Sequence, residues 1–556
     1  MDLCIRIAGE AGQGVQTTGN LLVEAFASAG LHVFATQSYM SRIRGGLNWF
    51  DVRIADRELL SGREKSDLLV ALHSDALHAL RGEAADGGLV LFDGEAEGDA
   101  LSVPFSKTAK ELTGATQAAN TVAAGTVFAL LGYDLDLLCD YLAVLFKKKG
   151  KEVIESNVRC ARRGAELAGE RAGTVKAPKS GTAPKDVHNG SEAVGLAAAT
   201  AGVKFVASYP MTPSTGVFTF LAGVADTYGI VVEQAEDEIA AINMICGAAY
   251  AGVPAMTTTS GGGFALMCEG LSLAGMLELP AFIMLSQRPG PATGLPTRTG
   301  QEDLRFAIHA GHGEFPRALF APGTPAQAYE LTRRALETAH KFQTPVIFLI
   351  DQFLADLQTG TPALDATYRP IDRHVVADPA PDYVRYAVTK DGVSPRALPG
   401  SGPFVVCDSD EHTEDGHITE DLGVRVALQD KRMAKLNGLR AEAMPPEPHG
   451  PEGAGTLLVA WGSTYGPCRE AVDILNAGGG SVAMAHFAQV WPLNAESARP
   501  IIERAGTKRV VVVEGNGGGQ FASMLREAGV LDDCECLPKY DGMPFTGEWI
   551  AERIGR

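Results

Sequence analysis

The sequence predicts a multidomain α/β protein, and three observations carry this prediction. Short β-rich runs alternate with helical segments in the first third of the chain, and the same alternation returns twice further on. A length of 556 residues exceeds what a single hydrophobic core accommodates. A stretch rich in Pro, Gly, Lys, Ser and Thr, without apolar periodicity, separates the first alternating region from the second.

These observations set the expected domain boundaries. The first α/β region, with a mostly parallel sheet, covers residues 1–172, and the linker covers residues 173–191. A second α/β region follows at 192–365, where runs such as KFVASYP, GIVVEQA and AFIMLSQ predict strands. Residues 366–453 are Pro-rich and irregular, and a third α/β region covers residues 454–556.

Composition excludes several classes of function. The chain is 46% hydrophobic and 21% charged, as in soluble globular proteins, and lacks an apolar run near the ~18 residues that a membrane span requires. A formal net charge of −19 disfavours binding to nucleic acid or anionic lipid. The N-terminus lacks the basic and apolar regions of a signal peptide, so we expect a cytoplasmic protein.

The nine cysteines are scattered, and no CxxC pair occurs among them. Neither a thiolate zinc site nor a four-cysteine iron–sulfur motif can therefore be assigned. We expect no metal ligands on this chain, and any redox centre to lie on another chain.

Gly9, Gly12 and Gly14 follow the first predicted strand and precede a helix. Glycines there allow a tight turn and close approach to a ligand. Because the spacing is GxxGxG rather than GxGxxG, a close strand-to-helix turn is favoured over a dinucleotide site. Arg42 and Arg44 stand beside two glycines in SRIRGGLN, where they are either solvated or reach an anionic group in a neighbouring site.

Three polar loops follow predicted strands of the second region. Ser208–Thr215, SYPMTPST, gathers hydroxyls on a backbone that two prolines hold extended, although turn chemistry alone also accounts for it. Thr257–Gly263 adds hydroxyls and glycines, and Gln287–Gly300 carries Arg288 and Arg298, whose forks suit carboxylates. Because parallel strands end at one edge of a sheet, we expect one shared ligand site.

Three carboxylates stand in front of a small-residue apolar helix in QAEDEIAAINMICGAAYAG. Glu236 and Asp237 are explained by their favourable position at the positive end of the helix dipole. Glu238 leads a helix with almost no polar face, so a buried carboxylate is expected there. A buried carboxylate needs a partner.

In their order and spacing these motifs are similar to those of a known family. SYPMTPST, QAEDEIAA, TTTSGGGFALMCEGL and GPATGLPTRTGQEDL resemble the alpha subunits of 2-oxoacid:ferredoxin oxidoreductases, especially the 2-oxoglutarate enzymes. GEAGQGVQ with SRIRGG resembles the gamma domain fused to such subunits, and DSDEHTEDGHITED is also similar to the family. The resemblance implies a gamma-type α/β domain over 1–172, the pyrimidine-binding domain of a thiamine-diphosphate fold over 192–365, and a transketolase C-terminal-like domain over 454–556.

The resemblance also implies roles for single residues. Glu238 would hydrogen-bond N1′ of the aminopyrimidine and promote deprotonation of the thiazolium, as suits a carboxylate among apolar neighbours. Thr212 would lie near the reacting carbonyl, Arg298 would pair with the C1 carboxylate, and Arg44 would close over the substrate or coenzyme A. The implied set comprises catalytic Glu238, Thr212 and Arg298; cofactor-binding Glu238, Tyr209, Pro210, Ser260 and Gly261; and substrate or coenzyme A contacts from Tyr209, Thr212, Arg298 and Arg44.

The sequence lacks the GDG and following Asn that anchor Mg²⁺ in thiamine enzymes, so the chain is expected to be half of an enzyme. The resemblance implies a beta subunit that supplies Mg²⁺, the diphosphate end of thiamine diphosphate and a [4Fe–4S] cluster. It implies an (alpha–beta)2 heterotetramer, with ferredoxin as electron partner and coenzyme A as co-substrate.

The expected function is oxidative decarboxylation of 2-oxoglutarate to succinyl-CoA and CO2 with reduction of ferredoxin. The same residues serve the reverse reaction, the reductive carboxylation of the reductive TCA cycle. Two alternatives stay open: another substrate, whether a branched-chain or aryl 2-oxoacid or pyruvate, and a noncatalytic scaffold subunit. The sequence assigns no residue to the distal carboxylate or to coenzyme A, and fixes neither the physiological direction nor the ferredoxin.

Overall fold

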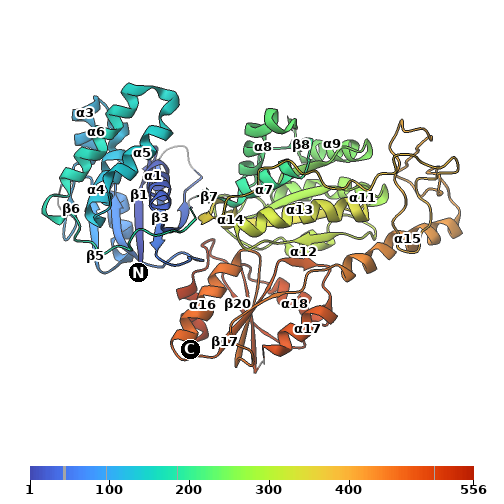
Figure 1. Cartoon of the computed structure of the whole chain (residues 1–556). Helices are drawn as coiled ribbons and strands as arrows, with labels where there is room; N and C mark the ends of the chain where they lie inside the picture. Colours follow the sequence, from blue (N-terminus) through green and yellow to red (C-terminus); the bar gives the residue numbers. More distant parts are fainter. Residues whose placement is uncertain (42–44, 96, 185, 506–507, 556) are drawn as a thin grey trace. The chain divides into compact units, whose positions relative to one another are not determined.

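The computed structural model describes residues 1–41, 45–95, 97–184, 186–505 and 508–555. The chain divides into two compact units (Figure 1). Unit 1 comprises Met1–Asn189, Asp356–Ala363 and Phe545–Arg556, and unit 2 comprises Gly190–Ala355 and Leu364–Pro544. Both combine sheets with helices, which confirms the predicted α/β class. Among the described residues, no helix combines the length and apolar character needed to cross a membrane.

Unit 1 contains an eight-stranded sheet of order β6-β5-β4-β1-β3-β2-β14-β7. The prediction of a mostly parallel sheet is wrong for half of it, because β1, β3, β2, β14 and β7 pair antiparallel while β1, β4, β5 and β6 pair parallel. The connection from β2 to β3 is too short for a crossover helix, which forces the antiparallel pairing. The strands are β1 Asp2–Ala11, β2 His32–Ser38, β3 Gly45–Ala55, β4 Ser66–Ala71, β5 Ala84–Phe92, β6 Leu101–Ser102, β7 Asp186–His188 and β14 Gln358–Thr361.

Helices cover both faces of this sheet because alternate strand residues point to opposite sides. Ile7 of β1 belongs to the core cluster with helices α1 and α4, where Phe26 and Phe128 stack with ring centroids 4.8 Å apart. Ala8, the next residue, belongs to the smaller cluster with α2. The helices are α1 Val15–Ser28, α2 Ser74–Leu80, α3 Phe105–Thr113, α4 Ala119–Leu131, α5 Leu135–Leu145, α6 Lys151–Leu167 and α19 Gly547–Ile554.

Unit 2 contains a seven-stranded sheet of order β18-β12-β13-β11-β10-β8-β9, parallel except for β18. Its core cluster unites α9 and α11 with Ile283 and Leu285 of β11, while α7 packs against α8 and α13. The strands are β8 Phe205–Ser208, β9 Val231–Gln234, β10 Ala255–Thr259, β11 Phe282–Gln287, β12 Ala318–Phe320, β13 Val346–Asp351 and β18 Gln489–Trp491. The helices are α7 Gly190–Thr200, α8 Thr215–Tyr228, α9 Glu238–Tyr250, α10 Gly261–Leu266, α11 Cys268–Met276, α12 Leu304–His309, α13 Pro325–Phe342 and α14 Gln352–Asp356.

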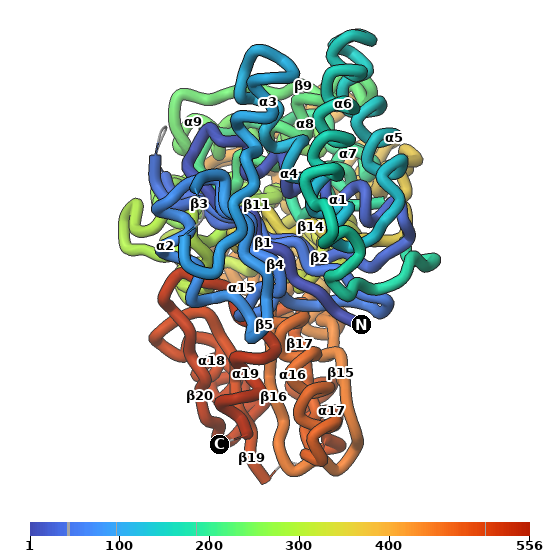
Figure 2. Tube along the Cα trace, turned by 90° about the vertical axis from the view of Figure 1, so that its left-hand side faces the viewer, coloured from blue at the N-terminus to red at the C-terminus, as the bar shows by residue number. Residues whose placement is uncertain are grey.

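A five-stranded sheet of order β15-β17-β16-β19-β20 also belongs to unit 2, and we call it the C-terminal sheet. Figure 2 shows these strands with α16 beside β17. The elements are β15 Glu447–His449, β16 Thr456–Trp461, α16 Tyr465–Ala477, β17 Val482–Phe487, α17 Ala495–Arg504, β19 Arg509–Glu514, α18 Gln520–Glu527 and β20 Glu535–Pro538. The predicted domain boundaries within the chain stay predictions.

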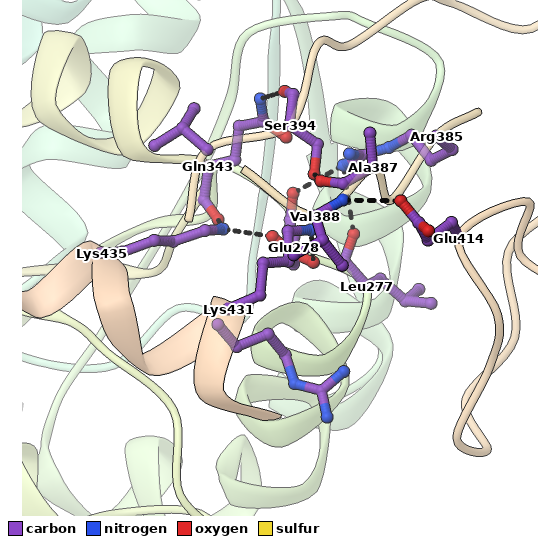
Figure 3. A network of polar contacts seen from close by, with 12 residues as sticks. Leu277, Glu278, Gln343, Arg385, Ala387, Val388, Ser394, Glu414, Lys431 and Lys435 are labelled. Carbon is purple, nitrogen blue, oxygen red and sulfur yellow. Dashed lines mark hydrogen bonds and ion pairs between the residues drawn. The ribbon is translucent and has the colours of Figure 1, made fainter. Parts of the chain in front are cut away.

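Residues 364–421 form no helix or strand in the part of the chain that the structure describes, but α15, Leu422–Ala441, follows and was not expected from the sequence. Three buried cations fasten this region to Glu278, which follows α11 (Figure 3). The ammonium nitrogens of Lys431 and Lys435 each lie 2.6 Å from a Glu278 carboxylate oxygen, and Arg385 donates to the Glu278 carbonyl at 3.0 Å. Burial alone would raise the pKa of Glu278, but the two lysines outweigh it and lower the pKa to about 2.

Candidate functional site

The start of α9 separates the three carboxylates into different roles. Asp237 is the N-cap, and its side chain accepts a hydrogen bond from the Ala240 N–H at 2.8 Å, which confirms its helix-end role. Glu236 is exposed just before the cap. Glu238 is only 2% exposed, and its Oε1 atom has no hydrogen-bond partner among the residues that the structure describes. Burial raises the pKa of the Glu238 carboxyl, against a backbone hydrogen bond that lowers it.

The glycines that begin α10 lie directly against carboxylates that have a buried oxygen. A Cβ on Gly263 would come within 2.2 Å of Glu238 Oε1, and one on Gly261 within 2.6 Å of Asp303 Oδ2. Within the described part of the chain, Asp303 Oδ2 and Ser260 Oγ are buried without hydrogen-bond partners, as is Glu238 Oε1. Burial raises the pKa of Asp303 to about 6. Buried polar groups in folded proteins are normally hydrogen-bonded, so these three atoms near the start of α10 indicate a site for a polar ligand.

The SYPMTPST loop leaves the carboxyl end of β8 beside this helix start. Ser208 Oγ accepts a hydrogen bond from the Thr258 N–H at 2.9 Å, which couples β8 to β10. Tyr209 is 40% exposed and Pro210 is also exposed, so both are accessible to a ligand or partner. Thr212 is half-buried, and its carbonyl accepts a hydrogen bond from Arg288 Nη1 at 2.6 Å.

The loop after β11, Gln287–Gly300, presents the arginines, and we call it the arginine loop. Its turn is closed by hydrogen bonds from the Leu295 N–H to the Pro289 carbonyl at 3.0 Å and from the Arg298 N–H to the Leu295 carbonyl at 3.1 Å. Arg288 and Arg298 are both half-buried, and burial lowers the pKa of each. The contact that brings this loop to Thr212 comes from Arg288, a residue outside the site set expected from the sequence.

Arg44, expected to reach the substrate or coenzyme A, lies outside the described residues, as does Arg42. The glycine motif of unit 1 forms the expected turn between β1 and α1, with φ of 93° at Gly12 and 77° at Gly14, values that suit glycine.

One group of potential metal ligands exists among the described residues, formed by Glu10, His73 and Asp75 of unit 1. His73 Nδ1 accepts a hydrogen bond from the Asp75 N–H at the start of α2. The other ring nitrogen, Nε2, lies 3.9 Å from a Glu10 carboxylate oxygen. These contacts explain the group as a helix cap with a polar neighbour.

Comparison with known proteins shows which family models match the chain. Residues 4–167 match the family model of pyruvate ferredoxin/flavodoxin oxidoreductase, and residues 196–430 match that of the thiamine-diphosphate-binding domain of pyruvate flavodoxin/ferredoxin oxidoreductase. These two matches indicate an oxidoreductase chain with a thiamine-diphosphate-binding domain.

Relatives match over nearly the whole chain. The 2-oxoacid:ferredoxin oxidoreductase subunit alpha of a Sulfolobus species is 30% identical over 99% of this chain and 96% of its own length. The 2-oxoglutarate oxidoreductase subunit KorA of Mycobacterium tuberculosis is 30% identical over 100% of this chain and 91% of its own. The solved 2-oxoglutarate:ferredoxin oxidoreductase of Magnetococcus marinus, with 2-oxoglutarate, coenzyme A and succinyl-CoA bound, superposes with a TM-score of 0.93 at 32% identity, covering 100% of this chain and 99% of that one. This chain belongs to the 2-oxoacid:ferredoxin oxidoreductase family, which confirms the resemblance seen in its motifs.

Proposed function

We propose that the chain is the alpha subunit of a 2-oxoglutarate:ferredoxin oxidoreductase, which converts 2-oxoglutarate and coenzyme A to succinyl-CoA and CO2 and passes two electrons, one at a time, to ferredoxin. The observation that carries this proposal is the match over the whole chain to the Magnetococcus marinus enzyme, which holds 2-oxoglutarate, coenzyme A and succinyl-CoA. Relatives described as 2-oxoglutarate synthase or oxidoreductase subunits support the same substrate.

The residues around α10 fit thiamine diphosphate. When bound, this cofactor supplies the carbon nucleophile for the 2-oxo carbon and accepts the electron pair left when CO2 departs. Glu238 offers an unpaired buried carboxylate oxygen to a ring nitrogen, and its raised pKa suits a group that shares a proton. Gly263 is required beside it because any Cβ would collide with that oxygen. Tyr209, Pro210, Ser260 and Gly261 line the same edge of the sheet as proposed cofactor contacts.

The 2-oxoacid is proposed to bind between the SYPMTPST loop and the arginine loop. Tyr209, Thr212 and Arg298 surround the 2-oxoacid. Thr212 lies near the reacting carbonyl, and Arg298 pairs with the C1 carboxylate. Arg288 joins this set because its guanidinium already reaches the Thr212 carbonyl and burial leaves it poorly solvated. A partly desolvated guanidinium gains most from pairing with a carboxylate.

The remaining parts of the enzyme are proposed to come from a beta subunit. This partner would carry Mg²⁺ and the [4Fe–4S] cluster, and two alpha–beta pairs would assemble together in the cytoplasm. Arg44 is proposed to meet the substrate or coenzyme A.

Replacing Arg288 with Met is expected to raise the KM for 2-oxoglutarate by roughly 10- to 100-fold, since a charge-assisted hydrogen bond contributes about 1.5–3 kcal/mol. Steady-state kinetics of the coexpressed complex measure this change. Arg333→Met is the matched control, because Arg333 lies on α13 and its guanidinium forms an ion pair with Glu337 of the same helix at 3.4 Å. An Arg288 variant with the KM of the wild type would remove Arg288 from the substrate site.

The proposed function is tested by coenzyme-A-dependent reduction of ferredoxin or methyl viologen. The chain is coexpressed with its proposed beta subunit and assayed with 2-oxoglutarate, pyruvate and 2-oxoisovalerate. Turnover confined to 2-oxoglutarate supports the proposal. Preference for another acid keeps the reaction and discards the substrate, and no turnover by a cofactor-loaded complex supports the noncatalytic alternative.

A further inference from the structure

Gln301 comes immediately after the arginine loop, and its side chain and backbone are hydrogen-bonded to the last residue of β16 and to the two residues that follow β19 in the C-terminal sheet. Its Nε2 donates to the Trp461 carbonyl at 3.0 Å, and its Oε1 accepts from the Gly515 N–H at 2.8 Å. Its backbone N–H donates to the Gly515 carbonyl at 2.7 Å, and its carbonyl accepts from Asn516 Nδ2 at 3.1 Å. With Gln301 only 2% exposed, these four bonds are shielded from water, so each of them is difficult to replace.

Thr299 makes a second attachment to the same part of the chain. Its N–H donates to the Gly542 carbonyl at 3.1 Å, and its hydroxyl bonds the Asp351 carboxylate, which also accepts from Ser463 at the end of β16. A Cβ on Gly542 would lie 3.0 Å from the Cβ of Arg298, and Gly542 has a φ of 84°. The backbone after β20 thus packs directly on Arg298.

The two ends of the arginine loop are also tied to each other. The Gly290 N–H donates to Glu302 Oε2 at 2.8 Å, and the Asp303 N–H donates to Gln287 Oε1 at 3.1 Å. Gln520 of α18 donates to the Glu302 carbonyl at 2.7 Å. Arg288 and Arg298 therefore stand on a loop whose two ends form one neck, and the neck is held by the C-terminal sheet.

We propose that Gln301 is a positioning residue for the 2-oxoacid: through it the C-terminal sheet holds the neck so that the two arginines meet the substrate carboxylate without further ordering. The proposal rests on the proposed function for its substrate. A loop ordered in advance loses less entropy when it binds than a mobile one, so the attachment acts on substrate affinity. The need for a side chain that both donates and accepts explains Gln, because Glu lacks the donor for Trp461 and Met lacks both groups.

The test uses Gln301→Met in the coexpressed complex. We expect hydrogen exchange of the amides in residues 288–303 to be roughly 10-fold faster, and the KM for 2-oxoglutarate to rise roughly 10-fold, since small misplacements of binding groups are costly. The value of kcat and the Kd for thiamine diphosphate are expected to stay within about threefold, because Glu238 is untouched. A merely structural defect would instead lower cofactor affinity and the melting temperature together.

Gln327→Ala is the matched control. Gln327 of α13 also joins the seven-stranded part of unit 2 to the C-terminal sheet, since its Nε2 donates to Glu447 at 3.3 Å. Its Oε1 accepts from the Gly323 N–H, so neither side-chain bond involves the arginine loop. Exchange of the loop amides and the KM are expected to match the wild type in this variant.

Ser463→Ala is the milder variant, because it removes only the hydroxyl that supports Asp351 and Thr299. Hydrogen exchange of the loop amides should be faster in this variant, as in Gln301→Met. If Gln301→Met does not fold, this variant tests whether contacts with the C-terminal sheet order the arginine loop. Wild-type exchange and wild-type KM in the folded variant would overturn the proposal. A wild-type complex without 2-oxoglutarate turnover would overturn the proposed function instead, while the exchange result would still test whether Gln301 holds the loop.

Discussion

Glu238→Gln is expected to lower kcat of the coexpressed complex by roughly 10²- to 10⁴-fold, the usual scale for loss of a positioned acid–base group. Among the described residues, the carboxylate oxygen that faces Gly263 has no hydrogen-bond partner. Burial also raises the pKa of this group, so its environment is suited to proton sharing with a ligand. Gln has the same shape but neither accepts nor releases that proton. The loss should therefore appear in kcat with little change in folding.

Asp237→Asn is the control for this experiment. It removes the neighbouring carboxylate, yet Asn is as good an N-cap as Asp and can still accept from the Ala240 N–H. Turnover within about twofold of the wild type is expected for it. If Glu238→Gln were as active as Asp237→Asn, the proposed role of Glu238 would be wrong, and a noncatalytic reading of this site would gain support.

Glu278→Gln is expected to destabilise unit 2 by about 3–5 kcal/mol, because removing one partner of a buried ion pair leaves uncompensated charge. Lys431 and Lys435 would both keep buried ammonium groups without the carboxylate that now lies 2.6 Å from each. The apparent melting temperature should fall on the order of 10 °C. Glu330→Gln, at an exposed position of α13, is expected to change stability by less than about 0.5 kcal/mol.

The pH dependence of this loss follows from the lowered pKa of Glu278. A carboxyl whose folded pKa is about 2 stabilises the folded state above its ordinary value of 4.5 and loses that contribution as the pH falls toward 2. The difference between wild type and Glu278→Gln should therefore shrink below pH 4.5. Adding Lys435→Met to Glu278→Gln should recover part of the loss, and a double variant no more stable than the single one would contradict the charge argument.

The sequence predicted those features whose residues are close neighbours along the chain. Asp237 and Glu238 were assigned because the apolar helix that follows them leaves one carboxylate capped and the next buried. The contact between Arg288 and Thr212 was not predicted, since it joins residues 76 positions apart. The signal that could have found it is the position of Arg288 directly after the buried strand β11, at the edge where the shared site was expected.

Helix α15 was missed for a different physical reason. Lys431, Arg432 and Lys435 resemble a solvated face of a helix, because charged residues are rarely buried. All three are at most 2% exposed, and their partners Glu278 and Glu411 are far away in sequence. Sequence periodicity cannot identify a core face made of paired charges.

The short strand β18 links the C-terminal part of unit 2 to the edge of the seven-stranded sheet. Gln489–Trp491 pairs with the edge of β12 in the seven-stranded sheet, so it saturates backbone groups that would otherwise invite pairing with another chain. A polypeptide truncated before this strand would expose the unpaired edge of β12, which is prone to aggregation. Conversely, cleavage of the backbone between the two sheets would leave β18 on one fragment and β12 on the other. Because these two strands pair, we expect the two fragments to stay associated.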